Sequence, residues 1–194
     1  MAREAGEMDS SPPPKIFLTG VPGCGKTTLI KGVAEHFAGR VTGFYTEEVC
    51  EAKGRRIGFD LVSHTGERAA FARKGGNART RVGPYSVFLK PLEDWGLELL
   101  RPCPERPLVI LDEVGKMECL SNVFQERVLE LLGSSCPILG SVALRGGGLI
   151  RRIHEHQEVE CREVTQANRT GLGRQLVAEY RNCLRALQAR RPLR

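Results

Sequence analysis

The chain has 194 residues, of which 41% are hydrophobic and 27% are charged, and its formal net charge is +6. This length and composition are typical of one ordinary globular domain that needs neither a metal nor a disulfide to hold its core. No apolar run approaches the roughly 20 residues of a membrane-spanning helix. We therefore expect no membrane partner and a cytoplasmic location.

The N-terminal segment and the cysteines set further limits. Residues 1–14 are rich in small and acidic residues and end in Ser-Ser-Pro-Pro-Pro, which predicts a disordered leader rather than a signal or transit peptide. The seven cysteines are widely spaced and include no Cys-x-x-Cys pair, which favours reduced thiols over a zinc site or a disulfide framework. We predict a single domain over residues 15–190.

Strand and helix patterns follow one another in the first half of the chain. An apolar run at 15–19 predicts a buried strand, and the apolar spacing at 26–37 predicts a helix that ends before Gly39. Extended runs separated by turn-like segments then predict an antiparallel meander; they lie at 41–49, 56–63 and 68–73. A strand at 85–89 and a helix that Pro91 opens and that reaches Leu100 complete this half.

The second half alternates regularly between strand and helix. The predicted strands lie at 108–111, 138–143 and 159–164, and the predicted helices at 122–132, 149–156 and 166–188. Alternation with short connections is typical of a mainly parallel sheet with helices on both faces. We therefore predict a three-layer α/β fold with an inserted antiparallel hairpin segment.

One segment matches the pattern G-x-x-x-x-G-K-[ST] at every fixed position. Its residues are Gly20, Val21, Pro22, Gly23, Cys24, Gly25, Lys26 and Thr27. Glycines let the backbone wrap a phosphate, so that N–H groups point inward at the head of a helix, where the helix dipole favours an anion. In such a loop the lysine reaches the β- and γ-phosphates and the Thr hydroxyl binds Mg²⁺. The segment predicts a nucleotide-binding loop with Lys26 as a catalytic residue.

A second motif is the apolar strand that ends in Asp112 and Glu113. An acid at the carboxyl end of a buried parallel strand lies beside the phosphate loop, where ligands bind in such sheets. We therefore predict that Asp112 and Thr27 hold Mg²⁺ and that Glu113 orients an attacking water.

The residues at the end of this strand and after it allow more than one interpretation. Asp112-Glu113-Val114-Gly115 fits the D-x-x-G pattern of GTP-binding switches, but the chain contains no Asn-Lys-x-Asp motif that would read guanine. Lys116 is a candidate for a second positive charge near the γ-phosphate, with a solvent-exposed lysine as the alternative. We retain Lys116 as a candidate catalytic residue.

These motifs belong to a longer set of segments. They are residues 17–20 (FLTG) with the loop that follows, 43–49 (GFYTEEV), 55–60 (RRIGFD), 110–118 (ILDEVGKME), and Val164-Thr165 with Asn168-Arg169. With them, residues 15–170 resemble the cancer-related nucleoside-triphosphatase family, small P-loop enzymes first known from thermophiles.

The resemblance implies the P-loop NTPase fold and magnesium-dependent hydrolysis of ATP, GTP and other nucleoside triphosphates, with loose base selectivity. It also implies that nucleotide contacts come from the phosphate loop and from the second motif. The contacts expected in the second motif are Val109, Ile110, Leu111, Asp112, Glu113, Val114, Gly115 and Lys116.

Three further features bear on function. Arg145 precedes three glycines at a predicted strand end, from which an arginine could reach the γ-phosphate, and a mobile surface loop is the alternative. The cations Arg73, Lys74, Arg79 and Arg81 resemble the lid of a nucleotide kinase, which is the second candidate function.

A third candidate function is a nucleotide-dependent switch that binds nucleic acid through its basic tail. After residue 150 the chain has ten arginines against five glutamates, although aromatic residues for base stacking are lacking. We expect a monomer whose partner is the nucleotide, not nucleic acid.

Overall fold

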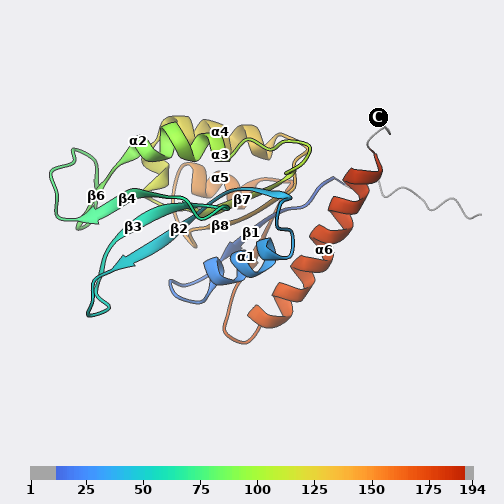
Figure 1. The fold of residues 1–194 in the computed structure, drawn as a ribbon, viewed down its shortest axis with the longest axis horizontal. Coiled ribbons are helices and arrows are strands. Elements are labelled where there is room, and N and C mark those ends of the chain that lie inside the picture. Colours follow the sequence, from blue (N-terminus) through green and yellow to red (C-terminus); the bar gives the residue numbers. More distant parts are fainter. Residues whose placement is uncertain (1–11, 191–194) are drawn as a thin grey trace, which may run out of the picture.

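The computed structural model describes residues 12–190, so most of the predicted leader lies outside the described residues. Figure 1 shows a central sheet with helices on both sides. The elements, in chain order, are β1 (Lys15–Thr19), α1 (Lys26–Glu35), β2 (Val41–Cys50), β3 (Arg56–Ser63), β4 (Arg68–Lys74), β5 (Arg81–Val82), β6 (Tyr85–Val87), α2 (Leu89–Pro91), the π-helical turn η1 (Leu92–Gly96), α3 (Leu97–Leu99), β7 (Leu108–Val114), the 3₁₀ turn η2 (Glu118–Leu120), α4 (Asn122–Leu132), β8 (Ile138–Val142), α5 (Leu149–Glu155), β9 (Val159–Glu163) and α6 (Arg169–Ala189).

The nine strands of the described residues form one mixed sheet in the order β5-β6-β4-β3-β2-β7-β8-β1-β9. Strands β2, β7, β8, β1 and β9 pair in parallel. Strands β3, β4, β6 and β5 extend the sheet from β2 by antiparallel pairing. The predicted three-layer fold is confirmed, and the inserted segment widens the same sheet instead of forming a separate hairpin.

Two hydrophobic cores cover the two faces of the sheet. One core packs under α4, α5 and the α2–α3 segment, and the other packs under α1 and α6. Successive residues of β7 serve opposite cores: Val109 and Leu111 face the first, while Leu108 and Ile110 face the second. This alternation explains why β7 reads as a continuous apolar run, since both of its faces are buried.

Several element boundaries differ from the sequence prediction. The strand predicted at 85–89 ends at Val87, and the following helix begins at Leu89 rather than at Pro91. The first turn of a helix leaves its N–H groups unpaired, so proline fits anywhere in that turn. Strand β7 continues to Val114 instead of ending at Leu111, which makes Asp112 and Glu113 part of the sheet.

Helix α6 begins at Arg169, three residues later than predicted. Thr165 and Asn168 form a reciprocal pair, in which each backbone N–H donates to the other side chain, at 2.8 and 3.2 Å. This reciprocal pattern is that of a capping box, and with the Arg169 N–H bonded to the Thr165 carbonyl oxygen at 3.1 Å it forms the turn from which α6 continues. Among residues 12–190, no helix is both long and apolar enough to cross a membrane.

Candidate active site

The carboxyl ends of the parallel strands bring the predicted residues to one edge of the sheet. Strand β1 leads directly into the phosphate loop, and β8, its neighbour, also pairs with β7. Parallel strands end at the same edge, so Asp112 on β7 and the loop that follows β8 lie beside the phosphate loop. Arg145, exposed in that loop, is therefore on the same edge.

The phosphate loop has the geometry of an anion site. Gly20 has φ 141°, and a Cβ there would lie 2.8 Å from the Val164 carbonyl oxygen, so only glycine fits. Gly25, at φ 104°, precedes α1, which has no side-chain cap and no acidic residue in its first turn. The first N–H groups of a helix lack internal partners, and here no side chain competes with a phosphate for them.

Lys26 lies across this loop. It is 9% exposed, and its Nζ donates a hydrogen bond to the Gly20 carbonyl oxygen at 3.1 Å. The ammonium is thus held against the phosphate loop, and its role in binding phosphate stays a prediction.

Asp112 is fully buried beside Lys26 and Thr27. The Ser141 hydroxyl donates to its Oδ1, whereas Oδ2 has no hydrogen-bond partner among residues 12–190. Burial raises the pKa of Asp112 to about 6; hydrogen bonds from Ser141 and Thr27 and the Lys26 charge oppose the rise, and Glu113 adds to it. A buried, unpaired carboxylate oxygen near a hydroxyl fits a hard cation such as Mg²⁺.

Glu113 and Lys116 flank the end of β7. Glu113 is half-buried, and Lys116 is exposed in the turn that leads to η2, where it forms no ion pair within the described residues. Gly115 lies between them and is buried. Both side chains are therefore at the edge where the strands end.

Four residues of the predicted contact segment have buried side chains. Val109, Ile110, Leu111 and Val114 are 0% exposed. Their side chains pack in the two cores, and their contact with a nucleotide stays a prediction.

Comparison with known proteins identifies the family. A family model described as NTPase matches residues 15–177. The chain is 39% identical over 159 residues to the nucleoside-triphosphatase THEP1 of Thermotoga sp. (strain RQ2), which covers 81% of this chain and 90% of that protein. It is 38% identical over 174 residues to the cancer-related nucleoside-triphosphatase of Homo sapiens, and the match covers 81% of this chain and 91% of that protein.

The chain belongs to the nucleoside-triphosphatase family. Solved structures agree: the crystal structure of THEP1 from Aquifex aeolicus matches with a TM-score of 0.75 at 30% identity, over 84% of this chain and 97% of that one. The solution structure of a human cancer-related nucleoside triphosphatase matches with a TM-score of 0.72 at 36% identity, over 92% and 100%. Proteins of this nucleoside-triphosphatase family are hydrolases, and the predicted resemblance is confirmed.

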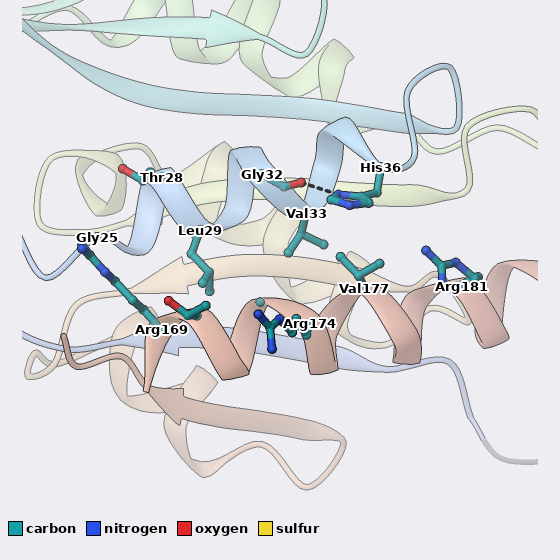
Figure 2. Close-up of a pocket in the computed structure, with 12 residues that line it drawn as sticks. Gly25, Thr28, Leu29, Gly32, Val33, His36, Arg169, Arg174, Val177 and Arg181 are labelled. Carbon is teal, nitrogen blue, oxygen red and sulfur yellow. Dashed lines mark hydrogen bonds between the residues drawn. The ribbon is translucent and has the colours of Figure 1, made fainter. Parts of the chain in front are cut away.

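A groove between α1 and α6 extends this nucleoside-triphosphatase site beyond the residues predicted from sequence. Figure 2 shows Leu29 and Val33 of α1 facing Val177 of α6, with Arg169 at one end. The groove encloses about 630 Å³ and begins at Gly25. A Cβ on Gly25 would lie 3.4 Å from Arg169 Nη1, so the guanidinium lies against the phosphate loop.

Arg169 lies beside the candidate site and was not among the residues that we predicted from the sequence. Its backbone N–H donates to the Thr165 carbonyl oxygen at 3.1 Å, whereas its guanidinium makes no hydrogen bond or ion pair within residues 12–190. The sequence did contain a signal for Arg169. The residue belongs to Val164-Thr165 with Asn168-Arg169, one of the segments that carry the family resemblance, but no role was assigned to it from the sequence. Only the packing of α6 on α1 brings it to the loop.

Two of the four cations that resemble the lid of a nucleotide kinase are bonded within the sheet. Arg73, on β4, donates to the Phe59 carbonyl oxygen at 2.8 Å and to the Asp60 carboxylate at 2.5 Å. Arg81, on β5, donates to the Gly76 carbonyl oxygen at 3.1 Å. Lys74, also on β4, and Arg79 are exposed.

Proposed function

We propose that this protein is a magnesium-dependent nucleoside triphosphatase that hydrolyses ATP, GTP and other nucleoside triphosphates to the diphosphate and phosphate. The observation that carries the proposal is the unpaired Oδ2 of buried Asp112 beside Thr27 and Lys26. Phosphoryl transfer needs positioning and charge neutralisation more than covalent chemistry. This cluster supplies both at the mouth of an uncapped helix.

Thr27 and Asp112 would hold the magnesium ion, which when bound supplies charge neutralisation to the phosphate oxygens. Within the described residues, no group of three or more His, Cys, Asp and Glu side chains could form a metal cage. A site of one carboxylate and one hydroxyl fits Mg²⁺, which usually keeps several waters and binds phosphate as well.

The remaining polar residues then have distinct roles. The loop N–H groups and Lys26 bind the phosphates, and the Gly20 carbonyl holds the lysine in place when they are absent. Glu113 accepts hydrogen bonds from the attacking water and orients it in line with the β–γ bond. Lys116 and Arg145, both exposed at the same edge, are placed to stabilise charge on the transferred group.

The groove between α1 and α6 is the proposed position of the nucleoside. It starts where the phosphate loop ends, and Arg169 provides a flat cation on which a base can stack. No acidic residue lines it, so no carboxylate is available to accept the N–H groups of guanine. Stacking on a guanidinium does not depend on the identity of the base, which supports loose base selectivity. We further propose a cytoplasmic monomer with no membrane or nucleic-acid partner.

The test is phosphate release from a panel of nucleoside triphosphates, each with magnesium and with excess EDTA. We expect release that needs magnesium, with the diphosphate as the other product. A parallel reaction with candidate nucleoside and nucleotide acceptors, separated by thin-layer chromatography, distinguishes hydrolysis from kinase activity. Transfer to an acceptor in preference to water would replace this proposal with the kinase function.

A further inference from the structure

Glu118 is a buried carboxyl group for which neither the sequence nor the proposed mechanism has a role. It is 4% exposed and opens the η2 turn, six residues after Asp112. Its Oε2 accepts a hydrogen bond from the Gly115 backbone N–H at 3.0 Å. Within residues 12–190 it has no ion-pair partner, although buried carboxylates are normally paired.

The surroundings of Glu118 connect it to Glu113. A Cβ added to Gly115 would lie 3.0 Å from Glu118 Oε2 and 3.5 Å from Glu113 Oε1. The two carboxyl groups therefore flank the same glycine, one from the interior and one from the site. A side chain there would crowd Glu118 Oε2, which would have to shift by a few tenths of an ångström, and would be in ordinary contact with Glu113 Oε1.

Burial raises the pKa of Glu118 to about 8, and the charges of Glu113 and Asp112 add to the rise, against hydrogen bonds from the backbone N–H groups of Glu118 and Gly115. At neutral pH the group is therefore a neutral acid that still accepts a hydrogen bond. A neutral acceptor holds Gly115 without placing another negative charge beside a site for a triphosphate.

We propose that Glu118 is a positioning residue for hydrolysis: through the Gly115 N–H it fixes the start of the turn after β7, between Glu113 near the end of that strand and Lys116 in the turn. The inference rests on the proposed function, because Glu113 orients the water there. Gly115 follows the last residue of β7 and precedes Lys116, and a second bond, from the Cys119 N–H to the Gly115 carbonyl oxygen at 3.1 Å, closes the turn. Displacement of a catalytic group by about 1 Å can reduce a rate about 100-fold.

The experiment compares two substitutions of Glu118 in the full chain. Glu118→Gln keeps an acceptor of the same shape without charge, whereas Glu118→Leu fills the space and removes the acceptor. We expect Glu118→Gln to keep kcat within about threefold of wild type. Glu118→Leu should lower kcat by about 10- to 100-fold, while the Kd for a fluorescent ATP analogue changes less than twofold.

Ser121→Ala is the matched control. Ser121 caps α4 by accepting a hydrogen bond from the Phe124 N–H at 3.2 Å, and it lies three residues from Glu118 without contact with Gly115. Its loss should lower the thermal midpoint and leave kcat unchanged. Unfolding of each variant is followed by circular dichroism, so that kcat is measured well below every midpoint.

Three outcomes would overturn the inference. An equal loss of kcat in Glu118→Gln and Glu118→Leu would mean that the carboxylic acid itself is required, and not only a hydrogen-bond acceptor for the Gly115 N–H. A loss in Glu118→Leu no greater than in Ser121→Ala would show a purely structural role, and an equal loss of nucleotide affinity would show a role in binding.

The design separates this inference from the function on which it rests. Absence of phosphate release by the wild-type chain would refute both the proposed function and the positioning role. Normal wild-type release with equal kcat in both Glu118 variants would refute only the positioning role. Amide hydrogen exchange at Gly115 provides a readout independent of turnover: we expect it to rise in Glu118→Leu and not in Glu118→Gln.

Discussion

The buried carboxyl group of Glu118 leads to a quantitative prediction about how the stability of the protein depends on pH. In the folded protein its pKa rises from 4.5 to about 8, chiefly because the carboxyl group is fully buried. In the unfolded chain the group is solvated and titrates near its ordinary value. Between these two pH values the unfolded chain has lost a proton that the folded chain retains.

The sign of the effect follows from that difference in bound protons. The folded state binds more protons than the unfolded state between these pH values. The contribution of Glu118 to the free energy of unfolding is therefore fully present below about pH 4.5 and falls by about 1.4 kcal/mol per pH unit until about pH 8. Glu118→Gln removes the titrating group and therefore this slope. Relative to wild type, the variant should gain less than about 1 kcal/mol at pH 5 and about 4 kcal/mol at pH 8, both order-of-magnitude figures.

Urea unfolding of both proteins at pH 5, 6, 7 and 8, followed by circular dichroism in EDTA, measures this gain directly. Ser121→Ala serves again as the control, because its effect should be the same at every pH. A constant difference between wild type and Glu118→Gln across this range would refute the reasoning, since it would mean that Glu118 is ionised or solvated in the folded protein.

Three further predictions concern the chemistry. Lys26→Ala should abolish phosphate release and weaken binding of a fluorescent nucleotide analogue, and wild-type turnover in that variant would remove the loop from the mechanism. Glu113→Gln should lower the single-turnover rate by about 10²–10⁴-fold with little change in nucleotide affinity, whereas Asp112→Asn should also raise the magnesium concentration needed for half-maximal rate. ATP and GTP should differ less than about tenfold in kcat/KM, or about 1.4 kcal/mol; a hundredfold preference would reveal a base-reading pocket.

Local signals in the sequence were sufficient for much of the fold. The phosphate loop is a contiguous motif whose glycines and lysine have defined geometric roles, so its strand–loop–helix context could be predicted without tertiary information. The apolar run of β7 and the helical spacing of α4 depend only on which residues must be buried. For the same reason, the position of Asp112 at the end of a buried strand could be predicted.

Strand order, in contrast, depends on contacts between distant segments. The pattern of residues 41–73 predicted antiparallel pairing, but nothing in it showed that β2 would pair with β7 and so join both halves into one sheet. Contacts between distant segments also decided the surroundings of the cations at residues 73–81. These cations resemble a lid in the sequence, whereas Arg73 and Arg81 form hydrogen bonds within the sheet in the structure.

The sequence by itself determined the chemistry that we predict for the site: a phosphate loop, an aspartate proposed to hold Mg²⁺ and a glutamate beside it, each defined by residues close together in the chain. Only the tertiary structure decided the rest. Arg169 reaches Gly25 because α6 packs on α1, and Glu118 becomes a buried acceptor because the turn after β7 folds inward. Burial and proximity are properties of the packed chain, and they place an arginine of a basic helix and a glutamate of a polar turn beside the candidate site.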